Sequence, residues 1–179
     1  MLIKLYGGVT MATRARIGIM LDDGKIISSY HHWDGYPGGL GYNLVENWNN
    51  EKKVIEAIKM GDASKWGCFI GYPIGFDDRD NPLYDYQNIY YGRDRGEKVT
   101  TITFENEEEF LKSGFDSGEE YIYLAKMEGK EQKFSKDKIL SWYYTEIDIK
   151  EFRPLERKAV KDHISIMQRY LELEEKGAL

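Results

Sequence analysis

Cysteine and proline are scarce in this 179-residue chain, which contains one cysteine, Cys68, and four prolines. A single cysteine forms neither an intramolecular disulfide nor a zinc site built from several thiolates, so we expect a reducing, cytoplasmic location. No apolar run approaches the roughly 20 residues of a membrane-spanning helix. The first residues also lack the charged, apolar and cleavable segments of a signal peptide. The sequence therefore predicts a protein without a membrane partner.

Known catalytic and cofactor-binding signatures are also missing. The chain has no nucleophile elbow, no Walker loop and no GxGxxG fingerprint. His31 and His32 are adjacent, so in a strand they point to opposite faces and do not bind one metal ion together. We expect no metal and no other cofactor, and the sequence favours a non-catalytic protein.

The chain is rich in aromatic and charged side chains. Hydrophobic residues make up 41% of it and aromatic residues 14%, a composition typical of a folded core rather than of a disordered segment. The length suits a single domain over residues 1–179. A net charge of -6 disfavours binding to nucleic acid polymers, which depends on many basic contacts with phosphates.

Hydrophobic patterning predicts an α+β fold whose antiparallel sheet begins with an N-terminal β-hairpin. Two strand-like runs, 12–21 and 25–33, flank Asp22-Asp23-Gly24, which is a hairpin signal. Short helices packed on the sheet are expected at 40–48 and 54–60, broken at Asn49-Asn50. The other expected elements are strands at 88–96, 98–104, 120–127 and 141–149, a helix capped by Asn106 and ending at Ser113-Gly114, a long loop at 71–88, and an amphipathic helix at 155–176. Residues 1–10 are interpreted as an N-terminal extension, and 130–179 as a C-terminal addition that ends in this helix.

One face of the hairpin carries the first candidate site. If Asp23-Gly24 is a two-residue turn, Arg16 faces His31 and Arg14 faces Trp33, with Gly18 leaving room beside them. Guanidinium groups suit carboxylates or phosphates, and an indole offers a stacking surface for a base. The alternative is a cation–π pair of Arg14 and Trp33 on a solvated face.

Two neighbouring segments extend this candidate site. The glycines of the segment 34–41 allow a backbone to approach a ligand closely, and Tyr36 offers a second ring for stacking. Arg93 and Arg95 share one side of an extended segment, with Asp94 on the other, and would add positive charge; the alternative is a charged surface turn. The complete set of candidate ligand-binding residues is Arg14, Arg16, His31, Trp33, Tyr36, Gly38, Gly39, Gly41, Arg93 and Arg95.

Two further interpretations stay open. His32 and Asp34 share a side if the strand continues, and a carboxylate can orient an imidazole as a general base, as in a hydrolase or phosphodiesterase; the alternative is a buried imidazole bonded to backbone. The C-terminal helix repeats apolar residues at heptad-like steps from Val160 to Leu171, which suits packing on its own domain or a homodimer contact through 155–176.

Three segments resemble a family of small proteins that recur in phage and prophage genomes. They are MATRARIGI (11–19), YHHWDGYPGGLG (30–41) and YYGRDRGE (90–97), and the resemblance covers roughly residues 11–127. His31 stands where many relatives have cysteine, which weakens any thiol role there. The resemblance implies a phage accessory protein, a group rich in inhibitors of host defence.

Together these observations lead to one main hypothesis and two alternatives. The main one is a phage anti-defence protein that binds and sequesters an anionic small molecule, such as a nucleotide or a nucleotide-derived immune signal. The alternatives are a hydrolase or phosphodiesterase that uses His32 and Asp34 on such a molecule, and a protein-interaction inhibitor of a host factor.

Overall fold

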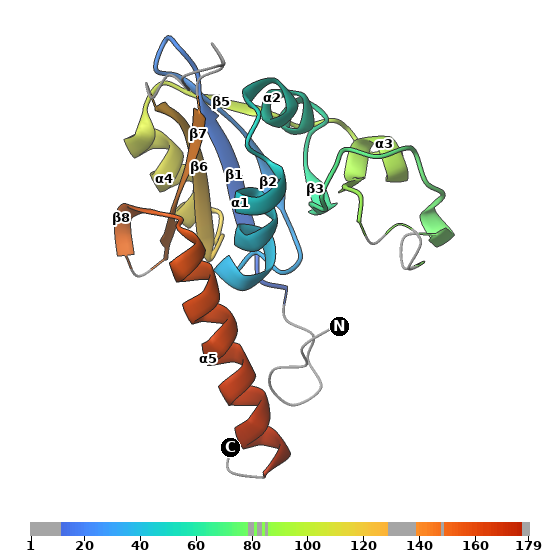
Figure 1. Cartoon of the computed structure of the whole chain (residues 1–179). Helices are drawn as coiled ribbons and strands as arrows, with labels where there is room; N and C mark the ends of the chain where they lie inside the picture. Colours follow the sequence, from blue (N-terminus) through green and yellow to red (C-terminus); the bar gives the residue numbers. More distant parts are fainter. Residues whose placement is uncertain are drawn as a thin grey trace.

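An eight-stranded sheet forms the centre of the protein in a computed structural model (Figure 1), which describes residues 12–78, 81, 84, 86–128, 139–147 and 149–176. The strand order is β4-β3-β2-β1-β6-β7-β8, and β5 pairs with β2 off this path. The strands are β1 (Ala15–Met20), β2 (Ile26–His31), β3 (Ala63–Lys65), β4 (Ile89–Tyr90), β5 (Ile102–Phe104), β6 (Tyr121–Glu128), β7 (Ile139–Glu146) and β8 (Ile149–Pro154).

The predicted α+β class and the N-terminal hairpin are confirmed, but the sheet is mixed rather than antiparallel. β1 pairs antiparallel with β2, and β6 with β7. In contrast, β1 pairs parallel with β6, and β2 pairs parallel with β3. Helices α1 (Tyr42–Asn47) and α2 (Glu51–Lys59) lie in the chain between β2 and β3. A connection of this length lets the chain return to start a parallel strand, which a tight hairpin does not.

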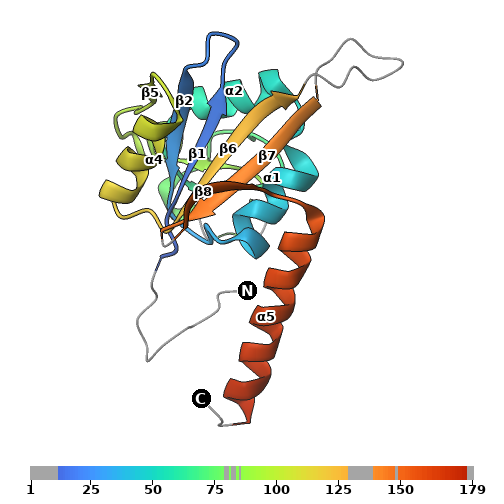
Figure 2. The same cartoon turned by 90° about the vertical axis from the view of Figure 1, so that its left-hand side faces the viewer.

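Helices cover both faces of the sheet (Figure 2). On one face, Leu44 of α1, Ile58 of α2 and Trp48, which follows α1, join a core that includes Ile17 and Ile19 of β1. On the other face, Phe110 of α4 (Glu107–Asp116) packs with Ile26, Phe104, Ile122 and Leu124. Side chains alternate between these two cores along β1, β2 and β6, as the period of a strand requires.

The hairpin turn is one residue longer than the predicted two-residue turn. The Leu21 N–H donates to the Lys25 carbonyl at 2.8 Å, which leaves Asp22, Asp23 and Gly24 as the loop. Gly24 has φ of +83°, the left-handed conformation that closes a three-residue hairpin. The predicted facing pairs are therefore wrong by one position. Arg16 lies opposite Tyr30, and Ala15 lies opposite His31.

Asparagine side chains cap the N-terminal ends of α2 and α4. The side chain of Asn50 accepts a hydrogen bond from the Lys53 N–H and caps α2, and Asn106 does the same for the Glu109 N–H at the start of α4. The predicted end of α4 at Ser113-Gly114 is wrong, because the helix continues to Asp116. A Cβ at Gly114 would lie 2.5 Å from Cδ1 of Ile122, so this glycine allows close packing on β6 rather than ending the helix.

The segment 88–96 is not the predicted strand. Only Ile89 and Tyr90 are extended, and α3 (Tyr91–Arg95) follows at once. The Asp94 carboxylate accepts a hydrogen bond from the Tyr90 N–H at 2.7 Å and closes the turn, which ends at Gly96 with φ of +69°. Arg93 and Asp94 therefore do not point to opposite sides of a strand, as the sequence suggested.

The C-terminal part of the chain completes the sheet before it leaves the body. β7 joins β6 over eight residue pairs, and the Trp142 indole N–H donates to the Trp48 carbonyl at 2.9 Å. The predicted C-terminal helix is present as α5 (Arg157–Glu175), which begins against the body and then extends away from it (Figures 1 and 2). Among the described residues, no helix has the length and apolar character needed to cross a bilayer. The predicted N-terminal extension, 1–10, lies outside the described residues.

Candidate functional site

Arg16 forms a buried ion pair inside the protein. Its Nε and Nη2 donate to the two carboxylate oxygens of Glu119 at 2.8 and 2.7 Å. Both side chains are buried, with 6% of Arg16 and 1% of Glu119 exposed. Burial raises the pKa of Glu119 above its ordinary value, although the guanidinium of Arg16 acts in the opposite direction. Because a bidentate partner already holds this guanidinium, Arg16 offers no charge to a ligand.

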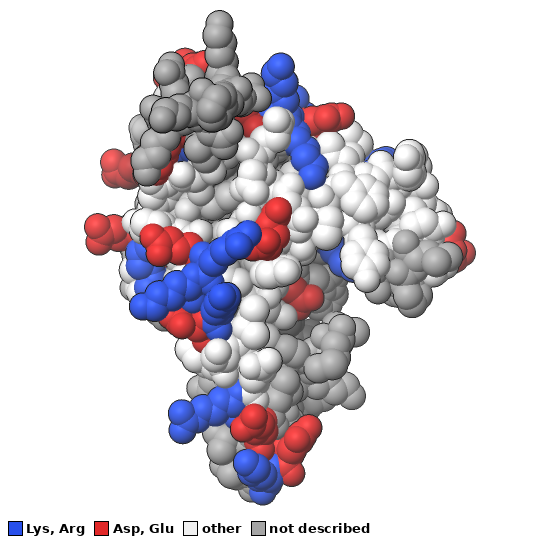
Figure 3. Space-filling model, in the orientation of Figure 1, with Lys and Arg blue, Asp and Glu red and all other residues white. Residues whose placement is uncertain are grey.

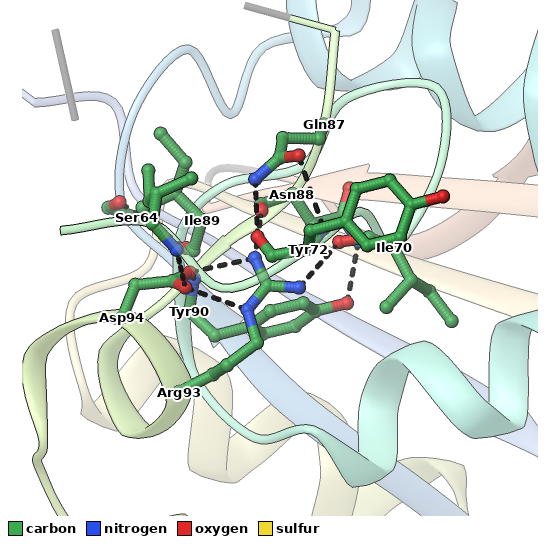
Figure 4. A network of polar contacts seen from close by, with 10 residues as sticks. Ser64, Ile70, Tyr72, Gln87, Asn88, Ile89, Tyr90, Arg93 and Asp94 are labelled. Carbon is green, nitrogen blue, oxygen red and sulfur yellow. Dashed lines mark hydrogen bonds and ion pairs between the residues drawn. The ribbon is translucent and has the colours of Figure 1, made fainter. Parts of the chain in front are cut away.

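Arg93 is also committed to the protein itself (Figure 4). It makes two hydrogen bonds to the Asp94 carboxylate and one each to the carbonyls of Ile70 and Asn88. Its guanidinium also lies over the Tyr90 ring, 5.0 Å from the centroid. The side chain is 10% exposed, so Arg93 ties the loop before β4 to α3 and does not join a ligand site with the hairpin arginines.

The glycines of the segment 34–41 pack against the chain rather than opening onto a site. A Cβ at Gly38 would lie 2.9 Å from Nδ1 of His163 on α5, and one at Gly39 would lie 2.5 Å from the Asp34 carbonyl oxygen. A Cβ at Gly41 would make ordinary contacts with Leu155 and Tyr123 at 3.4 Å. These residues form a π-helical turn, Pro37–Gly41, on which α5 rests.

Tyr36 and Asp34 also contact other residues of the chain. The Tyr36 ring stacks on His163 with centroids 5.3 Å apart and planes 13° apart. Its hydroxyl donates to the Asp34 carboxylate at 3.2 Å. Asp34 therefore contacts Tyr36 and not His32, and the proposed pairing of His32 with Asp34 for acid–base chemistry is wrong.

His31 lies in the core because of the hairpin register. It is 2% exposed, and its Nε2 hydrogen-bonds the Trp33 carbonyl. Burial lowers the pKa of His31 to about 3. A neutral, enclosed imidazole does not contact a ligand, so we leave His31 out of the candidate site.

A different cluster forms at the end of β2. The Tyr30 hydroxyl lies 2.7 Å from Nδ1 of His32. Burial lowers the pKa of His32, and the positive charges of Arg14 and Arg95 lower it further. Two of the four predicted arginines therefore act on one imidazole. We name Arg14, His32, Trp33 and Arg95 the anion surface.

Arg14 is the most accessible charge of the anion surface. Its side chain is 43% exposed, and its Nε lies 3.8 Å from a carboxylate oxygen of Glu120, beyond hydrogen-bond distance. The same Glu120 oxygen accepts the Arg14 backbone N–H at 2.7 Å. Glu120 therefore keeps a backbone partner if the Arg14 guanidinium turns toward an anion.

Arg95 and Trp33 flank the imidazole. The Arg95 guanidinium lies over the Tyr91 ring, 4.5 Å from the centroid, and its Nε is buried without a hydrogen-bond partner among the described residues. The Trp33 indole meets the His32 ring edge-on, with centroids 4.6 Å apart and an interplanar angle of 89°. Trp33 is half-buried, so part of the indole contacts solvent.

The protonation of His32 suits binding better than proton abstraction. Burial raises the pKa of Tyr30 to about 12, so its hydroxyl keeps its proton at neutral pH. When that hydroxyl donates to Nδ1, the ring proton of neutral His32 lies on Nε2. The imidazole then offers an N–H donor beside two guanidinium groups, a combination that fits the oxygens of a phosphate.

Two residues of this cluster were not among those predicted, Tyr30 and Tyr91. Tyr30 and His32 are two residues apart at the end of the predicted strand 25–33, so strand alternation would have indicated Tyr30. Tyr91 approaches only because α3 is helical, and the segment was predicted as a strand.

Two grooves lie elsewhere on the molecule. One, of about 340 Å³, lies beside β7 and is lined by Leu140, Trp142 and Glu156 among others. The second, of about 250 Å³, lies between α1 and α5 and is lined by Tyr42, Val160 and Ile164 among others. No residue of the anion surface lines either of these two grooves.

Neither a metal-binding cluster among the described residues nor a similar known protein indicates the function. Among the described residues, no group of three or more His, Cys, Asp or Glu side chains is arranged to hold a metal ion. The chain matches no protein-family model, and no curated protein sequence or solved structure matches it significantly. The resemblance to phage proteins therefore stays a prediction.

Proposed function

We propose that the protein binds and sequesters a compact anionic small molecule, a phosphate-bearing one such as a nucleotide, on the anion surface. The observation that supports this most is the 43% exposed side chain of Arg14 near a ring pair of His32 and Trp33, whose imidazole has a pKa lowered by the charges of Arg14 and Arg95. Two guanidinium groups and one N–H donor suit a terminal phosphate, and the Trp33 indole suits a base.

A small ligand fits better than a polymer. On the face shown in Figure 3, basic and acidic side chains lie side by side and form no continuous basic stripe. The chain carries a net charge of -6. A duplex or a long single strand needs many phosphate contacts, whereas one phosphate group needs only a few donors.

Binding without turnover fits the contacts of His32. A general base needs an accessible lone pair and a partner that orients the ring. The contact with Tyr30 occupies Nδ1, and the Asp34 carboxylate accepts from Tyr36 instead. These contacts support sequestration over a hydrolase or phosphodiesterase.

The phage resemblance supplies the context of the proposal. A phage protein that removes a nucleotide-derived immune signal from the host cytoplasm would act by binding alone. Such a protein needs affinity and abundance, and it needs no catalytic group.

Isothermal titration calorimetry tests this proposal with inorganic phosphate, AMP, ATP and a cyclic dinucleotide as the ligands. We expect at least one of them to bind, and Arg14→Gln and Arg95→Gln each to weaken that ligand about tenfold or more, since a charge-assisted hydrogen bond contributes roughly 1.5–3 kcal/mol. Lys112→Gln is the matched control because Lys112 is 74% exposed and pairs with Asp116 on α4. The ligand should be recovered intact after the protein is denatured.

Two results would overturn the proposal. One is the absence of heat for every ligand at millimolar concentration. The other is equal weakening by the arginine variants and by Lys112→Gln, which would reveal a non-specific charge effect. A chemically changed ligand would favour an enzyme instead.

A second candidate function, inhibition of a host protein, is favoured by exposed aromatic side chains on the loops around β4. Phe69, Tyr72 and Tyr86 are 43%, 77% and 68% exposed. The Gln87 amide holds this region by bonding both the N–H and the carbonyl of Tyr72. Rigid exposed aromatic rings are typical of protein interfaces. A host protein that co-purifies with the wild type but not with Tyr72→Ser plus Tyr86→Ser would support this function, and equal recovery with both would contradict it.

A further inference from the structure

Helix α5 has two apolar stripes, and the body of the protein covers one of them. Val160 is 3% exposed, and Ile164 and Met167 face Gly38 of the π-helical turn. The second stripe contains Ile166, which is 53% exposed, whereas His163 stacks on Tyr36 of the body. In the sequence Tyr170 and Leu173 follow Ile166 at heptad spacing. Ile166 lies on a helix that extends away from the body (Figure 2), where a second helix can cover it.

The charges beside this stripe are complementary to a second copy of the same helix. Asp162 and Arg169 are both exposed and lie seven residues apart, so they occupy the same position relative to the stripe. When two such helices run antiparallel around an axis between Ser165 and Ile166, Asp162 of each lies opposite Arg169 of the other. A two-fold axis produces this pair twice.

The distribution of charge along α5 favours the same direction. The helix begins with exposed Arg157, Lys158 and Lys161, and its last turns carry exposed Glu172 and Glu175. An antiparallel pair places the basic beginning of one helix beside the acidic end of the other. A parallel pair places like charges together at both ends.

We propose that two copies of the chain associate through α5 as an antiparallel helix pair, with Ile166 near the two-fold axis and two Asp162–Arg169 ion pairs beside it. This inference goes beyond the proposed function and does not depend on it. A helix of 19 residues spans about 28 Å, so the contact is short and its dimer forms at raised protein concentration.

Sedimentation equilibrium with charge-reversed variants tests the pairing. We expect the average mass to rise with concentration from the 20.9 kDa of one chain toward twice that value. Asp162→Arg and Arg169→Asp should each weaken association about tenfold or more, because each places like charges together twice. The two changes combined in one chain should restore it. Asp116→Arg on α4 is the matched control and should have no effect.

A mass that stays at one chain at every concentration would overturn the inference, and so would a double variant that associates no better than the single ones. Circular dichroism of each variant separates lost association from lost folding.

Oxidative cross-linking tests the direction of the pair in a Cys68→Ser background. An antiparallel pair brings Ile166→Cys close to its own copy. It separates two copies of Lys158→Cys, an exposed position, by about 22 Å, because each lies more than seven residues from the axis. Cross-linking at 166 and not at 158 supports the inference. Equal cross-linking at both positions, or none at 166, contradicts it.

Discussion

The hydroxyl of Tyr30, near the end of β2, lies 2.7 Å from Nδ1 of His32, the residue that follows β2. This contact occupies one nitrogen of an imidazole whose pKa the charges of Arg14 and Arg95 lower. Several sequence motifs suggested a ligand site. Arg14, His32 and Trp33, near the end of β2, keep part of their surface exposed to solvent.

The pKa of His32 reports directly on this arrangement. Burial lowers it first, and the charges of Arg14 and Arg95 lower it further. Arg95→Gln and Arg14→Gln should therefore each raise the pKa of His32 toward its ordinary value, as followed by NMR titration of the imidazole protons. Lys112→Gln should leave it unchanged. An unaltered titration in both arginine variants would show that the two charges do not act on this ring.

The buried pair of Arg16 and Glu119 should carry a large share of the stability at the end of β1. Glu119→Ala leaves an uncompensated buried guanidinium and should lower the free energy of unfolding by about 3–5 kcal/mol, measured by urea denaturation. Arg16→Met combined with Glu119→Leu should recover most of that loss, because no buried charge then remains. Glu105→Ala, which breaks the exposed contact with Lys25, should leave the midpoint almost unchanged. A similar loss in Glu105→Ala and Glu119→Ala would contradict the assignment.

His31 should make the protein sensitive to acid. Its pKa is about 3 in the folded protein and 6.5 in an ordinary environment, so below pH 6.5 the unfolded chain binds a proton that the folded protein does not. The free energy of unfolding should therefore be highest above pH 6.5 and should fall as the pH drops toward 3. Urea denaturation at several pH values should show a shallower fall in His31→Gln, whatever its stability at pH 7.5. Parallel curves for the two proteins would show that His31 is not responsible.

Gly18 should be sensitive to a single added methyl group. A Cβ at this position would lie 2.6 Å from Cζ of Phe110 and 2.9 Å from Cγ2 of Ile26. Gly18→Ala should cost about 1–3 kcal/mol of unfolding free energy through overpacking, and Phe110→Leu in the same chain should relieve part of the clash. Gly41→Ala serves as the control because its Cβ would meet neighbours at an ordinary 3.4 Å. Equal stability of Gly18→Ala and the wild type would show that the two cores are looser than described.

Local signals predicted the elements well wherever they were strong. Asn106 satisfies an N–H group at the first turn of α4, as the sequence predicted, whereas Asn50 caps α2 at a position that was predicted only as a break between two helices. The apolar period of α5 also predicted a helix of about the observed length. Each signal depends on residues within one or two turns of one another.

The candidate site was predicted less well, because it depends on register and on distant partners. One extra residue in the turn at Gly24 moved His31 into the core and placed Tyr30 opposite Arg16. Glu119, the partner of Arg16, is 103 residues away in the chain, and no local pattern indicates it.

The amino-acid sequence by itself determined that this protein is folded, acidic and of mixed α and β structure, because composition and short-range periodicity carry that information. Tertiary structure decided which charges remain accessible. Four arginines were equivalent in the sequence, yet Arg16 and Arg93 are neutralised inside the fold, whereas the charges of Arg14 and Arg95 act on His32. The physical reason is that a guanidinium is available to a ligand only where no buried carboxylate accepts its hydrogen bonds, and the fold decides which carboxylates are buried beside it.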